Sequence, residues 1–392
     1  MNKPMTLQGL DFNVASIPKL VFGPGRIGEA ATLAAEFSGP VLLVTGQRSF
    51  EAAEGLTEAL AERNLPHDRI VVQEEPTPAI VDEAVAAHPK TGVVIAVGGG
   101  AAIDAGKAIS AMLPDGEPVR DFLEGVGTKK PNGRKVPFIA CPTTAGTGAE
   151  ATKNAVLSEV GPGGFKKSLR HDRYIPDAVV IDPALAVGCG SLVTAACGMD
   201  ALTQLLEAFV SDKASPMTDA LARSGLQAVA DSLQRCFEQP QDLSARGGMA
   251  WAAFCSGICL AHAGLGVVHG FASTLGGLYA IPHGVVCGTL LPAATEANVR
   301  WLIENEPTGP ALKRFAEVGR MFGLQEPDDQ TAAQKLIEAL YDLKKKLSLP
   351  PLGDYGIGAE DHILDATGLK NNPALLGRAA LRDVLIRSGA VA

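Results

Sequence analysis

Two histidines lie in an apolar stretch whose composition suits a metal site. His269 and His283 are fourteen positions apart in VVHGFASTLGGLYAIPHG, and the whole chain of 392 residues has only seven histidines. Asp200 and Gln204 lie four apart in the helical segment CGMDALTQLLEAFVS, and therefore share one helix face. Zinc or iron readily accepts one carboxylate and two imidazoles, whereas glutamine is a weak ligand. From the residues alone, core histidines that have found hydrogen-bond partners are an alternative interpretation.

Two loops rich in glycine and threonine suit phosphate binding. VGGGAAIDAGKAIS, residues 97–110, follows a strand-like run and opens a helical one, where glycines let backbone N–H groups approach a phosphate. The spacing is not GxGxxG, so a tight turn without a ligand is an alternative. CPTTAGTGAEATKNAV, residues 141–156, places four threonine hydroxyls after another strand. Because ligands of open parallel sheets bind at the carboxyl ends of the strands, the two loops together indicate a nucleotide site.

The elements that must position these residues change character halfway along the chain. In the first half, apolar runs alternate with amphipathic helical stretches, which predicts an open parallel α/β domain over residues 1–186, the part that carries both candidate nucleotide loops. From Ser191 onward helical spacing dominates, and we expect an all-helical domain over residues 187–392, the part that carries the candidate metal ligands. The predicted strands are residues 40–46, 69–73, 92–100, 137–144 and 178–182.

Composition excludes several classes of protein. The net charge is −9 and basic residues form only short clusters, so a nucleic-acid partner or an anionic membrane surface is not expected. The first twenty residues lack the apolar core of a signal peptide, and no run reaches the roughly 18 apolar residues of a membrane span. Seven scattered cysteines indicate free thiols in a reducing compartment, and Cys255 with Cys259 fits core packing. We therefore expect a cytoplasmic protein.

Four blocks resemble the signatures of the iron-containing (group III) alcohol dehydrogenase family: GGGAAIDAGKAIS, PTTAGTGAEAT, GMDALTQLLEAFVSDKASPMTDAL and AGLGVVHGFASTLGGLYAIPHGVVCGTLLP. The resemblance implies the architecture of that family and of dehydroquinate synthase, with an NAD- or NADP-binding domain, a helical metal domain and catalysis between them. It implies interconversion of an alcohol and an aldehyde or ketone by hydride transfer, in a homo-oligomer, expected to be a dimer. The family holds its metal with one aspartate and three histidines. These positions are Asp200, His269 and His283 here, and Gln204 occupies the remaining histidine position.

The resemblance also implies a set of cofactor contacts. Asp104 matches the family aspartate beside the nicotinamide ribose, although an acidic residue near a helix start also stabilises the helix dipole. Gly46 stands where NAD-preferring relatives have an aspartate, so exclusion of NADP is lost and Arg48 could meet a 2′-phosphate. The cofactor is therefore NAD or NADP, with a preference for NADP. The expected cofactor-binding residues are Gly46, Gly98, Gly99, Gly100, Asp104, Thr143, Thr144, Thr147, Lys166 and Leu185.

Two departures from the family pattern leave other functions open. Many members have a second histidine, which serves in proton transfer, where this chain has Ser273. A serine needs water or the cofactor ribose to complete a proton relay. Together with Gln204, this departure is compatible with the maleylacetate reductase branch, which works without a metal and acts on an oxo acid. A catalytically silent nucleotide-binding relative is a third hypothesis, but such a protein has no need of a three-ligand cleft.

Overall fold

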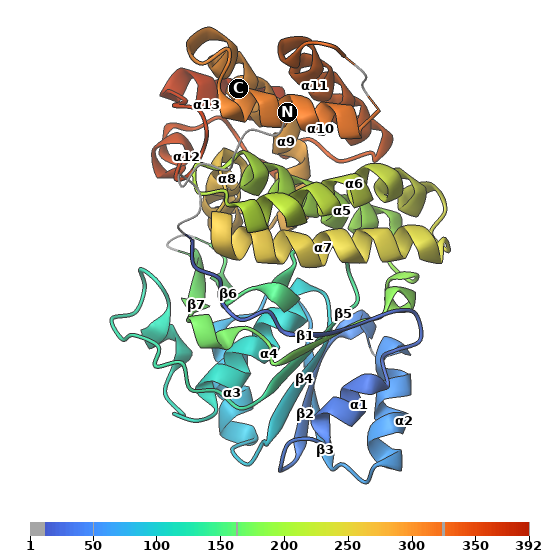
Figure 1. Cartoon of the computed structure of the whole chain (residues 1–392). Coiled ribbons are helices and arrows are strands. Elements are labelled where there is room, and N and C mark those ends of the chain that lie inside the picture. Colours follow the sequence, from blue (N-terminus) through green and yellow to red (C-terminus); the bar gives the residue numbers. More distant parts are fainter. Residues whose placement is uncertain (1–11, 50, 162–163, 324–325, 392) are drawn as a thin grey trace.

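The computed structural model describes residues 12–49, 51–161, 164–323 and 326–391. Within them an α/β domain and a helical domain are stacked, with the helix α7 (Leu243–Ala263) lying along their boundary (Figure 1). Residues 1–11, on which much of the signal-peptide prediction rests, lie outside the described residues.

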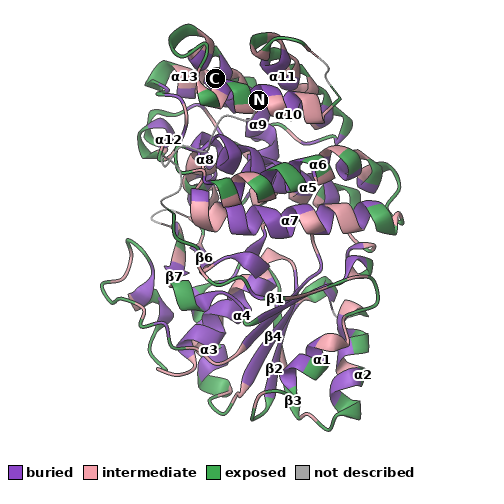
Figure 2. Cartoon of the chain, viewed as in Figure 1, coloured by how far each residue is buried: buried purple, intermediate pink, exposed green. Residues whose placement is uncertain are grey.

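The α/β domain is built on a six-stranded sheet in which every neighbouring pair is parallel. Strands β2, β4 and β5 are buried along nearly their whole length, as the apolar runs VLLVTG, VVIAVG and FIACP require of strands covered on both faces. Figure 2 shows these central strands as buried. The order across the sheet is β1 (Lys19–Phe22), β8 (Ala178–Ile181), β5 (Phe138–Pro142), β4 (Val93–Gly98), β2 (Val41–Gly46) and β3 (His67–Val72).

Helices cover both faces of the sheet. The side chains of α1 (Glu29–Ala34) and α2 (Glu54–Glu62) pack on one face. Those of α3 (Pro78–Ala87) and α4 (Gly100–Met112) pack on the other. All five predicted strands are present, and the prediction of a parallel α/β domain is confirmed. Strand β1 was not predicted, because KLVF is too short to give a periodic signal.

The order in which the chain adds strands to the sheet reverses its direction between the neighbouring strands β2 and β4. From β2 the chain moves outward to β3, whereas from β4 it moves the other way through β5 to β8. Ligands of open parallel sheets bind at such a reversal, beyond the carboxyl ends of the strands. Gly46 and Gly98, the last residues of β2 and β4, lie at this point.

A two-stranded antiparallel hairpin projects from the α/β domain toward the helical one. It consists of β6 (Asn154–Glu159) and β7 (Phe165–Arg170), and sequence periodicity did not predict it. Strand β6 packs on α4 and β7 packs on α8 (Val267–Leu278). The hairpin therefore places Lys166 between the two domains.

The second domain is all helical, as predicted. The last strand of the large sheet ends at Ile181 and the first long helix begins at Ser191; the boundary between residues 186 and 187 stays a prediction. Besides α7 and α8, the helices are α5 (Ser191–Val210), α6 (Pro216–Glu238), α9 (His283–Asn305), α10 (Pro310–Met321), α11 (Asp329–Lys346), α12 (Asp361–Ala366) and α13 (Arg378–Arg387).

Helix α5 is the centre of the helical core. It is the one described single helix long and apolar enough to cross a membrane, but 89% of that stretch is buried inside the structure. Its neighbours α6, α7 and α9 pack around it. Helix α5 is thus a buried core helix, and Cys255 and Cys259 lie in the same core, as expected.

Candidate active site and metal centre

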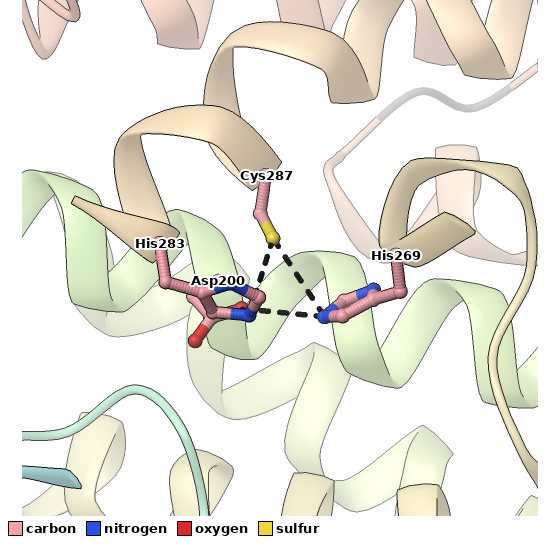
Figure 3. Close-up of side chains that lie close together, drawn as sticks. All are labelled: Asp200, His269, His283 and Cys287. Carbon is pink, nitrogen blue, oxygen red and sulfur yellow. Dashed lines mark hydrogen bonds and ion pairs between the residues drawn. The ribbon is translucent and has the colours of Figure 1, made fainter. Parts of the chain in front are cut away.

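Three helices bring the candidate metal ligands together. Asp200 lies in the middle of α5, His269 in the first turn of α8, and His283 is the first residue of α9. Their side chains converge with Cys287, one turn further along α9 (Figure 3). The structure therefore joins Asp200, His269 and His283 in one cluster, as the sequence predicts.

The return of His283 toward His269 does not depend on a bend at the glycines between them. Gly276 and Gly277 lie inside α8. The chain turns at residues 279–282, where Tyr279 ends the helix and Pro282 precedes the next one. The two imidazole rings end 5.5 Å apart between centroids.

The polar atoms of the cluster are close but incompletely bonded. Asp200 Oδ1 lies 3.5 Å from His269 Nε2 and 3.6 Å from His283 Nε2, too far for good hydrogen bonds. Asp200 is 1% exposed, and its Oδ1 has no hydrogen-bond partner among the described residues. A buried carboxylate oxygen without a donor is costly, and a cation placed between these atoms would remove that cost. The donor set of one carboxylate and two imidazoles fits a divalent zinc or iron ion.

The charge states of Asp200 and His283 suit the binding of a cation. Although burial raises the pKa of Asp200, the adjacent His283 and His269 outweigh burial and lower the pKa below its usual value. Burial lowers the pKa of His283 to about 4, so this imidazole is neutral near pH 7, as a ligand must be. Burial also lowers the pKa of His269, but the groups facing it, Cys287, Asp200 and Glu207, raise it well above its usual value.

Glu207 is a functional candidate that sequence reasoning missed. Its Oε2 lies 2.7 Å from His269 Nδ1 and its Oε1 accepts a 2.7 Å hydrogen bond from the Val268 N–H. A proton on Nδ1 leaves His269 Nε2 free to face Asp200, which is the orientation that a metal-binding histidine needs. Glu207 lies seven residues after Asp200 on α5, and this i, i+7 spacing was the available signal.

Gln204 is buried near Asp200 but has another partner. Its Oε1 lies 2.8 Å from Ser256 Oγ on α7. Its predicted role as a ligand, direct or through water, stays a prediction. Ser273 is exposed on α8, one turn after His269, and its role in a proton relay also stays a prediction.

The predicted phosphate-binding glycines lie where a strand ends and a helix begins, as expected. Gly98 ends β4, and Gly99 is the N-cap of α4 without any side-chain cap, so N–H groups of the first turn are free for an anion. A Cβ at Gly99 would lie 3.3 Å from Thr144 Oγ1, and one at Gly100 would lie 2.8 Å from Thr147 Oγ1. The close approach of the second loop therefore favours glycine, most strongly at Gly100.

The second predicted loop and the end of β2 border the same place. Thr143 donates its N–H to Gly98 O over 2.9 Å, and a Cβ at Gly98 would lie 3.2 Å from Gly46 N. The structure thus brings together Gly46, Gly98, Gly99, Gly100, Thr143, Thr144 and Thr147 at the reversal point of the sheet. Leu185, half-buried in the 3₁₀ turn Pro183–Ala186, follows the last strand.

Asp104 and Lys166 form a second, charged group. Burial raises the pKa of Asp104, and Lys107, Glu75 and Lys166 are among the charges that act on it. Lys166 donates to Glu75 over 3.0 Å, and both also act on His283. Asp104 is the fifth residue of α4, beyond its first turn, so the alternative of a dipole-stabilising residue loses its basis. Glu75 is a second residue that the sequence reasoning missed.

Comparison with known proteins agrees with this geometry. Residues 18–183 match the family described as iron-containing alcohol dehydrogenase, and residues 194–382 match the C-terminal domain of the Fe-containing alcohol dehydrogenase family. Alcohol dehydrogenase 4 of Saccharomyces cerevisiae is 32% identical over 353 residues, 88% of each chain. The 1,3-propanediol dehydrogenase of Klebsiella pneumoniae is 34% identical over 282 residues, which are 71% of this chain and 69% of that one.

A solved structure supports the same relationship. The crystal structure of a 1,3-propanediol oxidoreductase superposes with a TM-score of 0.85 at 28% identity, over 96% of this chain and 100% of the other. None of these relatives points specifically to the maleylacetate reductase branch.

Proposed function

The chain belongs to the iron-containing alcohol dehydrogenase family and is an oxidoreductase of that class, and on this premise we propose that it interconverts a small uncharged alcohol and its aldehyde. Hydride passes to or from NAD(P) in the cleft between the two domains. The convergence of Asp200, His269 and His283 in one buried cluster carries this proposal. A silent nucleotide-binding relative has no use for such a cluster.

The cleft favours a substrate without charge. The lysine that acts on His283 is Lys166, and its charge is balanced by Glu75 at 3.0 Å. An oxo acid of the maleylacetate type brings carboxylates that need unbalanced cations. The Klebsiella relative is named as a dehydrogenase of 1,3-propanediol, a small diol, which supports a small alcohol here as well.

Metal-assisted chemistry divides the work among named residues. A divalent ion bound at this site would supply Lewis-acid chemistry, either polarising a substrate carbonyl or lowering the pKa of an alcohol, which would make hydride transfer easier. Asp200, His269 and His283 would hold the ion, and Glu207 keeps His269 in the required orientation. The loops at Gly99 and Thr144 position the cofactor's phosphates, while Ser273 together with water relays the proton.

We propose that NADP is preferred to NAD. β2 ends at Gly46, the position where NAD-preferring relatives have an aspartate. Glycine has no side chain there that could repel a 2′-phosphate. Arg48 is exposed just after the strand, whereas Ser49 is buried with its Oγ 3.5 Å from Thr143 Oγ1. Arg48 is thus the better candidate for the 2′-phosphate. A preference for NADH over NADPH of more than tenfold in side-by-side reduction assays would overturn this part of the proposal.

We further propose a cytoplasmic homodimer. Phe12, Val14, Ile17 and Phe22 are all exposed apolar residues, and they lie in or just before β1, an edge strand of the large sheet. Exposed apolar groups at an edge that pairs with no further strand in the described part of the chain are typical of a surface that a second copy covers. Light scattering coupled to size exclusion would show a mass near twice that of the 40.5 kDa chain.

The test of the function is a substrate screen with and without metal. We expect cofactor oxidation with short aldehydes and little with oxo dicarboxylates, and loss of activity on chelation that zinc or iron restores. His283→Ala should lose bound metal and activity together. Full activity in protein shown to be metal-free, or a preference for oxo dicarboxylates, would transfer the assignment to the metal-independent branch.

A further inference from the structure

We propose that Cys287 is the fourth protein ligand of the ion, in place of Gln204, and that its thiolate makes the site prefer zinc to iron. The proposal rests on the metal-assisted function above. The sequence pattern assigns the fourth position to Gln204, one turn from Asp200 on α5. The structure places a different side chain, from a different helix, beside Asp200 and the two histidines (Figure 3).

The position of Cys287 follows from its helix. His283 and Cys287 are the first and fifth residues of α9, so their side chains lie one above the other on one face. Cys287 is fully buried, and its Sγ lies 3.6 Å from His283 Nε2 and 3.7 Å from His269 Nε2. The sulfur therefore faces the two nitrogens that would bind the ion.

The distances between the ligand atoms match those of a tetrahedral site. Zinc bonds of about 2.1 Å to nitrogen or oxygen and about 2.3 Å to sulfur imply separations of about 3.6 Å for N···S and about 3.4 Å for N···O. The two N···S distances are 3.6 and 3.7 Å, and the N···O distances from Asp200 to the two histidines are 3.5 and 3.6 Å. These four separations thus agree with a tetrahedral site to within a few tenths of an ångström, and all four ligand atoms lie within 4.8 Å of one another.

Asp200 provides an independent sign that a cation belongs there. Its side chain is 2% exposed, and its Oδ1, the atom that faces both histidines, has no hydrogen-bond partner among the described residues. The side-chain oxygen of Gln204, in contrast, has a hydrogen-bond partner, because Ser256 Oγ on α7 lies 2.8 Å from its Oε1. The carboxamide is better placed to fix the packing of α5 on α7 than to bind the ion.

A thiolate in the fourth position changes the chemistry of the site. Binding would release the thiol proton to solvent, and the charges of Asp200 and Cys287 would together balance a divalent ion. With glutamine as the fourth ligand, the site would instead keep one positive charge. Sulfur is a soft ligand that favours zinc, whereas an all-nitrogen and oxygen set suits iron as well. Zinc in catalytic sites accepts a fifth donor, so four protein ligands do not close the site to substrate.

Cobalt(II) tests the proposal without reference to activity. A thiolate bound to Co²⁺ gives a ligand-to-metal charge-transfer band in the near ultraviolet, which carboxylate, imidazole and carboxamide ligands do not give. We expect this band in full-length protein loaded with one equivalent of Co²⁺. We expect Cys287→Ser to lose the band while still binding the ion, and Gln204→Ala to keep it. Cys197→Ser is the matched control, because Cys197 lies only three residues before Asp200 on α5 yet lies outside the cluster.

The outcomes separate this proposal from the proposed function. Cobalt that binds stoichiometrically without the band, or a band that survives in Cys287→Ser, overturns the role of Cys287 but leaves a metal-assisted enzyme. Protein that takes up no Co²⁺ overturns both. In anaerobic competition between equimolar Zn²⁺ and Fe²⁺, we expect Cys287→Ser to bind the two ions in a zinc-to-iron ratio about tenfold or more lower than that of the unmodified protein. An unchanged ratio would contradict the preference for zinc.

Discussion

At the scale of single residues, two carboxylates on one helix have different tasks. Asp200 and Glu207 both point from α5 toward His269, but Asp200 faces Nε2 with an unbonded oxygen, whereas Glu207 contacts Nδ1. One is placed to bind an ion and the other to orient an imidazole. The i, i+7 spacing gives both residues access to the same ring.

We expect Glu207→Gln to weaken metal binding by about tenfold to a hundredfold. Glutamine has one acceptor oxygen in place of two, so it cannot serve both the Val268 N–H and His269 Nδ1. Chelator competition measures the affinity. Thr203→Val is a suitable control, because Thr203 is buried on the same helix but donates only to Met199 O. Equal affinities in Glu207→Gln and the unmodified protein would contradict the orienting role.

The sequence identified the ligands only in part, for a physical reason. Asp200, Gln204, His269 and His283 were grouped from their residue types and spacing, and the resemblance to the family then assigned Gln204 to the fourth ligand position. Cys287 was missed because its relation to His283 depends on α9 beginning at His283 itself. Pro282 marks that start, since proline cannot continue a preceding helix, but the apolar stretch around it gives no boundary by periodicity.

At the scale of elements, the phosphate-binding loop depends on space for backbone groups. We expect Gly99→Ala to fold normally, because Gly99 has an ordinary φ of −73° and the new Cβ would meet only Thr144 at 3.3 Å. The methyl group would nevertheless occupy the approach to the helix N-terminus, so the Kd for NADPH should rise about tenfold or more. Fluorescence titration measures it.

Gly55→Ala provides the matched control for the glycine experiment. Gly55 lies inside α2 of the same domain, and a Cβ there would be 3.5 Å from Ile27, an ordinary contact. Cofactor affinity should not change in this variant. If both variants bind NADPH as the unmodified protein does, the loop at Gly99 does not hold the phosphates.

The turn that carries Glu150 should make stability depend on pH. Burial raises the pKa of Glu150 to about 7, above the usual value of 4.5. The folded protein therefore holds this proton more tightly than the unfolded chain, so the stability that Glu150 contributes is fully present below about pH 4.5 and is lost as the pH rises toward 7. Glu150→Gln should melt at the same temperature as the unmodified protein at pH 5 and at a higher temperature at pH 8. A difference in melting temperature between Glu150→Gln and the unmodified protein that is the same at pH 5 and pH 8 would contradict this explanation.

The elements themselves were predictable where their pattern was long. The five predicted strands and the helices between them follow from apolar runs and helical spacing, whereas the β6–β7 hairpin does not. Its strand FKKSLR has two consecutive lysines, of which Lys166 is half-buried and Lys167 exposed, and it does not show the strict alternation of apolar and polar residues that marks a half-buried strand. The contact of Lys166 with Glu75, 91 residues away, is beyond any local pattern.

At the scale of the whole molecule, two glycines fix the contact between the domains. Gly148 belongs to the threonine-rich loop of the α/β domain and has a left-handed φ of +61°, and Gly257 lies on α7 of the helical domain. A Cβ at Gly257 would lie 2.1 Å from Gly148 O. The backbones touch directly, beside Ser256, which lies 2.8 Å from Gln204 Oε1 and 3.4 Å from Gly146 O. This contact therefore sets the distance between the cofactor loop and the metal ligands.

We expect Gly257→Ala to impair catalysis more than folding. The methyl group must displace the loop by roughly an ångström, and misplacement on that scale can cost about a hundredfold in rate. The cost in stability should be about 1–3 kcal/mol, as for other overpacked sites.

Gly247→Ala is the control on the same helix, because a Cβ there meets only Pro183 at 3.9 Å. It should keep full activity and be slightly more stable, since alanine favours helix over glycine. Steady-state kinetics with saturating metal, together with thermal melting, measure both effects. Unmodified kcat/KM in Gly257→Ala, accompanied by a lower melting temperature, would show that the cleft adjusts without loss of alignment.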